Sequence, residues 1–182
     1  MGIPVFLSYP KPHMKVQQTF IDCVIKYLQD RGLDGHTLGQ SDYDIDAPLA
    51  SIRRMMLEAN GVLVIAFRRY RVEKGVENDG TDTGKGKIRD ISGKWMTSPW
   101  CQVESAMAFQ LALPLLILRE EGVHADGILQ HGVIGTYMPE FNLANGCDDY
   151  FKSGEWKQLI AQWEGRVRKI RETKGSPPLY GV

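Results

Sequence analysis

The sequence predicts a single α/β domain in which one parallel sheet of five strands carries helices on both faces. Short apolar segments alternate with longer amphipathic segments along the chain, a pattern typical of right-handed β–α–β connections. The clearest strand, residues 61–67, is continuously apolar and rich in β-branched side chains, as expected for a parallel strand covered on both faces. The 182 residues suffice for one core of ordinary size.

The N-terminal half begins with an apolar block that is stopped by Ser8 and two prolines. Apolar positions then recur at helical spacing, and Gly32 is placed to end that helix. Asp46 is a candidate cap for the next helix, with Pro48 in its first turn. The expected elements are a strand at 3–7, a helix at 13–31, a weaker strand at 33–38, a polar loop at 39–46 and a helix from about Pro48.

The C-terminal half continues the alternation after a charged, glycine-rich segment without periodicity, which predicts a long exposed loop. The residues Gly175-Ser176-Pro177-Pro178 predict a flexible C-terminal tail over 173–182. The expected elements are the loop at 69–97, a helix at 100–112, strands at 61–67, 113–118 and 133–137, a short helix at 125–130 and a helix at 149–172.

Charge and cysteine content narrow the functional classes. Basic and acidic side chains balance at 22 each, so neither nucleic acid nor an anionic membrane is an expected partner. No apolar stretch approaches 18 residues, and residues 1–8 lack the pattern of a signal peptide. Cys23, Cys101 and Cys147 are odd in number and widely spaced, which predicts unpaired thiols in a reducing cytoplasm.

Three ligand motifs fail on spacing. The segment 80–87 does not have the glycine spacing of a phosphate loop, and it follows no strand. The acidic segment 42–46 begins like a calcium loop but continues with Ala47 where that loop needs glycine. It serves either to cap its helix or to bind ribose hydroxyls. The four histidines show no helical pairing, so no metal site is expected.

Trp100 and Glu104 are the most informative residues. They stand four apart at the start of the helix predicted at 100–112, so both side chains project from one face. Near the first turn, the helix dipole favours the ionised form of Glu104. Its loop leads to the carboxyl edge of the sheet, where residues 8–12 and 39–46 also lie and where ligands of such folds bind. These positions predict a pocket; the plain alternative is a solvated helix residue.

Two segments resemble signatures of Toll/interleukin-1 receptor (TIR) domains. Val5-Phe6-Leu7-Ser8-Tyr9 is similar to the first strand of the family, and Ser98-Pro99-Trp100-Cys101-Gln102-Val103-Glu104 is similar to its Ser-x-Trp-Cys-x-x-Glu segment. The elements between them follow the family's order, over roughly residues 1–140. The resemblance implies a flavodoxin-like, TIR-like domain over residues 1–172.

Bacterial and plant proteins of this family cleave the bond between nicotinamide and ribose in NAD, and some cyclise the product. The resemblance therefore implies an NAD glycohydrolase or ADP-ribosyl cyclase, with NAD as substrate and no cofactor. It implies that Glu104 is the catalytic carboxylate. One carboxylate suffices because nicotinamide departs neutral and needs no general acid. The residues implied to border the substrate are Ser8, Tyr9, Tyr43, Asp44 and Trp100.

By analogy with the family, we expect a cytoplasmic role in antiphage defence signalling. Self-association, or an activating or effector protein partner, is expected as well. Two alternatives stay open from the sequence. The first is a non-enzymatic module that uses the same fold for assembly, and the second is an enzyme that resembles nucleoside deoxyribosyltransferases, which share this architecture and a catalytic Glu.

Overall fold

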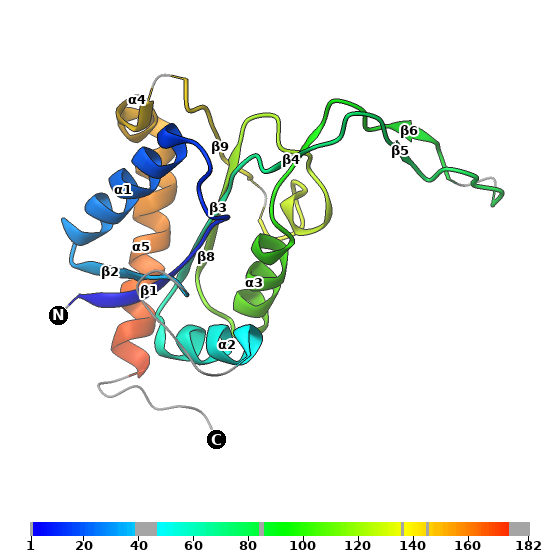
Figure 1. Cartoon of the computed structure of the whole chain (residues 1–182). Coiled ribbons are helices and arrows are strands. Elements are labelled where there is room, and N and C mark those ends of the chain that lie inside the picture. The colour runs from blue at the N-terminus through cyan, green and yellow to red at the C-terminus, as the bar shows by residue number, and fades with distance from the viewer. Residues whose placement is uncertain (1, 39–46, 84–85, 136, 145, 175–182) are drawn as a thin grey trace.

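A computed structural model describes residues 2–38, 47–83, 86–135, 137–144 and 146–174. Its main sheet has five parallel strands in the order β2-β1-β3-β8-β9 (Figure 1). This order confirms the predicted flavodoxin-like α/β architecture. The strands are β1 (Ile3–Ser8), β2 (Leu33–His36), β3 (Val62–Ala66), β8 (Leu115–Glu120) and β9 (Glu140–Phe141).

Helices cover both faces of this sheet (Figure 1). One buried cluster joins the sheet to α1, α4 and α5, and a second joins the other face to α2 and α3. The central strand β3 is buried along its whole length, as its continuous apolar sequence predicted. The helices are α1 (Lys15–Gln29), α2 (Pro48–Glu58), α3 (Pro99–Gln110), α4 (Gly146–Lys152) and α5 (Gly154–Lys174), with a 3₁₀ turn η1 (Gly127–Leu129).

Side chains of β1 alternate between the two clusters. Val5 and Leu7 belong to the cluster under α1, whereas Phe6 belongs to the cluster under α3. Because successive side chains of a strand point to opposite faces, Ser8 lies on the α3 face. This places a buried hydroxyl, 1% exposed, at the carboxyl end of the strand.

The helix α2 begins at Pro48 with Ala47 at its N-cap position. Proline at the first position suits a helix start, because its missing N–H would have no partner inside the helix. The predicted cap, Asp46, and the predicted loop 39–46 lie outside the described residues.

The predicted loop at 69–97 is exposed over most of its described residues, but it contains regular structure that the prediction missed. The segment forms two antiparallel ribbons, β4 (Tyr70–Arg71) with β7 (Trp95–Met96) and β5 (Val76–Glu77) with β6 (Arg89–Asp90). Together they make an arm that projects away from the body of the domain (Figure 1). Strands of two residues are too short to show an alternating pattern, and backbone hydrogen bonds across the ribbon supply the order.

The strand predicted at 133–137 is also misplaced. Val133 lies in a turn that also contains Gly132 at φ +85°, and the Val133 N–H donates to the Gln130 carbonyl. The chain pairs with β8 only afterwards, at Glu140 and Phe141 in β9. Within this segment Ile134 packs against the cluster under α3, whereas Val133 and Tyr137 are exposed.

The predicted helix at 149–172 is two helices. Ser153 separates α4 from α5, and its hydroxyl accepts a hydrogen bond from the Trp156 N–H at 3.1 Å. This bond caps the start of α5. At the other end α5 reaches Lys174, two residues into the predicted tail, where the Lys174 ammonium donates to the Leu57 carbonyl at 3.2 Å.

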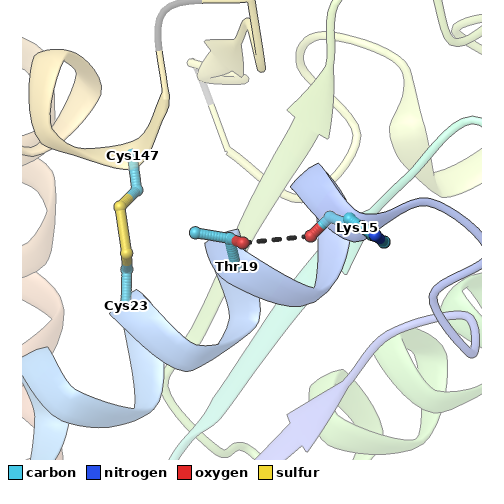
Figure 2. The surroundings of a disulfide bond; sticks show 4 residues. All are labelled: Lys15, Thr19, Cys23 and Cys147. Atoms are coloured by element: carbon cyan, nitrogen blue, oxygen red, sulfur yellow. Dashed lines mark hydrogen bonds between the residues drawn. A yellow bond between two sulfur atoms is a disulfide. The ribbon is translucent and has the colours of Figure 1, made fainter.

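Cys23 and Cys147 form a disulfide between α1 and α4 (Figure 2). The prediction that the cysteines are unpaired is wrong for these two, and only Cys101 is a free, buried thiol among the described residues. The cysteines therefore no longer support a reducing compartment. In the described part of the chain, no helix has both the length and the apolarity to cross a membrane.

Candidate active site

The start of α3 is fixed by the residues just before it. The Ser98 hydroxyl accepts the Trp100 N–H at 3.3 Å and Pro99 occupies the first turn, so the helix begins with a side-chain cap and a preset φ. Since α3 connects parallel strands, its N-terminal end lies at their carboxyl edge. The sequence prediction that this helix starts at the ligand edge agrees with the fold.

Glu104 points into the protein from the second turn of α3. It is 9% exposed and shares the buried side of the helix with Cys101, Ser105 and Ala108. The plain alternative of a solvated helix residue is therefore wrong. A carboxyl group in this position has lost most of its hydrating water. Its charged form then needs hydrogen bonds from other polar groups, and without them the group takes up a proton.

Ser8 is the polar group beside this carboxyl. Its hydroxyl lowers the pKa values of both Glu104 and Cys101. The Ser8 oxygen is buried, and within the described structure it makes no hydrogen bond of ordinary length and angle. The Ser8 hydroxyl therefore retains hydrogen-bonding capacity for a carboxylate or a ligand. Leaving a buried hydroxyl unsatisfied costs roughly 1–3 kcal/mol, which favours such a partner.

Burial raises the pKa of Glu104 to about 7, and the Ser8 hydroxyl opposes this shift. Loss of solvent is thus the largest effect on this carboxyl, and it favours the protonated form. At neutral pH the group exists in both protonation states. Strongly shifted carboxyl groups at a sheet edge are candidates for catalytic roles.

Replacing Ser8 by alanine should raise the pKa of Glu104 above its wild-type value of about 7, since the hydroxyl that favours the ionised form is removed. A ¹³C NMR titration of the Glu104 carboxyl in both proteins measures the shift. Ser92→Ala, on the exposed arm, should leave the titration unchanged. An unchanged or lowered pKa in Ser8→Ala would show that the hydroxyl does not act on this carboxyl.

Trp100 and Glu104 differ in their exposure to solvent, although their spacing predicted that both side chains project from one face of α3. Trp100 is 43% exposed at the first turn, whereas Glu104 faces the sheet. The indole can border a ligand that enters from solvent, but it does not enclose the carboxyl. Val103 and Phe109, 40% and 64% exposed, also leave apolar surface on the outer side of the helix.

Tyr9, a further predicted substrate residue, does not lie on the Glu104 side of the sheet. Tyr9 packs against the cluster under α1, on the opposite face of the sheet from Ser8. Burial raises its pKa, as does the nearby Asp22, and Thr37 hydrogen-bonds its side chain. Tyr43 and Asp44 lie outside the described residues.

Arg69 is a site residue that the sequence interpretation missed. Its guanidinium donates to the Ser98 hydroxyl at 3.4 Å and lowers the pKa of the Cys101 thiol, which burial raises to about 12. Arg69 thus places a positive charge at the start of α3. The available signal was its position three residues after β3, at the carboxyl edge of a central strand.

Over the residues that the structure describes, no three His, Cys, Asp or Glu side chains gather closely enough to hold a metal ion. The polar groups described around Glu104 are the Ser8 and Ser98 hydroxyls, the Cys101 thiol and the Arg69 guanidinium.

No family model matches the chain, and no curated protein matches it either. Solved structures of similar fold include a CMP N-glycosidase from Clostridium botulinum, with 13% identity, a TM-score of 0.49, and coverage of 87% of this chain and 98% of that chain. They also include the TIR domains of the activated Roq1 resistosome, with 13% identity, a TM-score of 0.42, and coverage of 93% and 83%. At this identity the likeness concerns the fold alone.

Proposed function

We propose that the protein cleaves the bond between nicotinamide and ribose in NAD, with Glu104 as the catalytic carboxylate. The observation that carries this proposal is the burial of Glu104 beside the Ser8 hydroxyl, at the carboxyl edge of the central strands. The products are nicotinamide and either ADP-ribose or a cyclic ADP-ribose isomer. The TIR-like segments around Ser8 and Glu104 support NAD as the substrate.

The chemistry requires one anionic group in the right place. Nicotinamide carries a positive charge in NAD and departs neutral, so no proton must be delivered to the leaving group. Positive charge develops on the ribose instead, and a preorganised carboxylate stabilises that charge in a site from which water is excluded. Attack by water gives ADP-ribose, and attack by the adenine of the same molecule gives a cyclic isomer.

The direct test incubates the purified protein with NAD at high protein concentration and follows nicotinamide by chromatography. Mass spectrometry and NMR then identify the second product. Absence of nicotinamide release under concentrated conditions, with NAD in excess, would contradict the proposal.

The rate of NAD cleavage should rise with pH through about 7 and level off above pH 8. Only the ionised form of Glu104 stabilises a ribose cation, and burial raises the pKa of this group to about 7. The measurement is kcat/KM for NAD between pH 5.5 and 9. A rate that falls over this range would instead identify a protonated Glu104 as a general acid, as a glycosidase with a poor leaving group requires.

A role in antiphage defence signalling in the cytoplasm is part of the proposal, supported by the resemblance to bacterial TIR proteins. Infection of cells that carry the wild-type or the Glu104→Gln protein tests this role. Equal phage yields from both would contradict it.

The exposed apolar side of α3 favours a second candidate function, which is assembly without catalysis. Trp100 and Val103, three residues apart, are 43% and 40% exposed there, and apolar surface of this kind is often covered by another protein. This candidate predicts self-association that Glu104→Gln leaves intact, measured by sedimentation, and no turnover of NAD.

A further inference from the structure

A cavity of about 490 Å³ lies at the carboxyl edge of the sheet. Its walls come from the start of α1, from the residues that follow β3 and β9, from β7 and from the end of β8. The disulfide between Cys23 and Cys147 joins α1 to α4 (Figure 2), and both helices adjoin these walls. Of these two helices α1 contributes Val16 to the wall, and α4 begins two residues after Ala144 of the wall.

This cavity is separate from the Glu104 site because it lies on the other face of the sheet. Glu120 is the last residue of β8, and alternation places it on the same face as Leu116 and Leu118. Those two residues belong to the cluster under α1, α4 and α5. Glu104 belongs to α3, which covers the opposite face (Figure 1).

Glu120 is the buried polar group of the cavity, with an exposure of only 7%. One carboxyl oxygen accepts the Arg68 N–H at 2.8 Å, and the other lies 3.7 Å from Arg68 Nε. The same Nε donates to the Glu121 carbonyl at 2.6 Å. A carboxylate can accept about four hydrogen bonds, so Glu120 keeps acceptor capacity while its position is fixed.

The lining favours a ligand with hydrogen-bond donors and without negative charge. Glu121 is a second carboxyl on the wall and accepts from the Asn142 amide. Arg68, the guanidinium on the wall, directs its Nε toward the Glu120 carboxyl and the Glu121 carbonyl. A phosphate would face two carboxyl groups and one guanidinium. Trp95 adds an aromatic residue to the lining.

We propose that this cavity binds an unphosphorylated ribonucleoside. Glu120 accepts hydrogen bonds from the ribose hydroxyls, and Trp95 stacks on the base. A carboxylate near the end of a parallel strand is a common acceptor for ribose hydroxyls in α/β folds, and stacking of a base on an aromatic ring tolerates every base. The site goes beyond the proposed NAD cleavage and does not depend on it.

The test titrates adenosine, 2′,3′-dideoxyadenosine and AMP into the whole chain carrying Glu104→Ala, by calorimetry at pH 8. This background removes turnover and any contribution of the Glu104 carboxyl. We expect adenosine to bind, dideoxyadenosine to bind at least tenfold more weakly, and AMP to bind no more tightly than adenosine. The Trp95 indole N–H resonance, assigned from the Trp95→Phe protein, should shift on addition of adenosine.

Variants localise the binding. Glu120→Gln should weaken adenosine at least tenfold, because the amide group donates where the carboxylate accepted. Glu73→Gln, an exposed carboxyl on the arm, is the matched control and should bind as the background protein does. If Glu120→Gln does not fold, Trp95→Ala is the variant that tests the assignment. It should weaken adenosine binding at least tenfold, whereas Trp95→Phe should still bind adenosine.

Three results would each overturn the assignment. These are no adenosine binding at millimolar concentration, equal binding of adenosine and its dideoxy analogue, and tighter binding of AMP than of adenosine. Because the protein in this experiment lacks Glu104, none of these results bears on whether the wild-type protein cleaves NAD.

Discussion

Glu104→Gln should release nicotinamide from NAD about 10³-fold more slowly than the wild-type protein. The amide keeps the size of the side chain but carries no negative charge, so the ribose cation loses its stabilising partner. Removing one preorganised electrostatic group from a buried site typically costs a factor of about 10²–10³ in rate, and the full charge of a carboxylate belongs at the upper end. The measurement is the initial rate of nicotinamide release at pH 8, where the wild-type carboxyl is ionised.

Loss of the fold does not explain such a result, because Glu104→Gln should be at least as stable as the wild type at this pH. The pKa of Glu104 is raised from 4.5 to about 7 in the folded protein, so the unfolded chain loses this proton first as pH rises. The wild type therefore loses stability between about pH 4.5 and pH 7, by roughly 3 kcal/mol at most. The glutamine variant does not ionise and keeps that stability.

Glu172→Gln, an exposed position on α5, is the matched control for the rate measurement and should turn over NAD as the wild type does. Equal rates for the wild type and Glu104→Gln would remove this carboxyl from the mechanism. Sedimentation of both proteins in the same buffer should agree, which separates a chemical effect from a change of assembly.

Loss of the Cys23–Cys147 disulfide should lower the free energy of unfolding by about 4 kcal/mol. The two cysteines are 124 residues apart in the sequence, and a cross-link over so long a loop strongly restricts the unfolded chain. The bond also ties α1 to α4 within one buried cluster. Denaturant unfolding of the Cys23→Ala/Cys147→Ala protein and of the oxidised wild type measures the difference.

Reductant supplies the control for this prediction. It should lower the free energy of unfolding of the wild type to near that of the double variant. The free energy of unfolding of the double variant should not change, because its remaining cysteine, Cys101, is buried and forms no disulfide. Identical unfolding midpoints for oxidised and reduced wild type would show that the cross-link does not stabilise the domain.

The sequence was sufficient where local pattern and burial agree. The apolar run that forms β3 is buried throughout, and the serine, proline and apolar residues at 98–110 start and maintain α3. Because parallel strands share one carboxyl edge, the element order also predicted that Ser8 and Glu104 belong to the same edge. The Ser8 hydroxyl lowers the pKa of Glu104, which agrees with this prediction because the effect requires the two side chains to be close.

Sequence patterns failed where order comes from partners far along the chain. The ribbons of the arm have strands of two residues, too short for any periodicity, and the segment 133–137 has strand-like side chains but forms a turn before β9. The odd cysteine count suggested free thiols, because nothing local to Cys23 or Cys147 indicates that α1 and α4 pack together.

By itself, the order of apolar and amphipathic segments determined the α/β class, the central strands and the edge at which a ligand site would form. Only the tertiary structure decided the protonation of Glu104, the disulfide and the cavity beside Glu120. The physical reason is that hydropathy periodicity is a property of neighbouring residues, whereas desolvation of a carboxyl and contact between two sulfur atoms depend on groups that folding brings together.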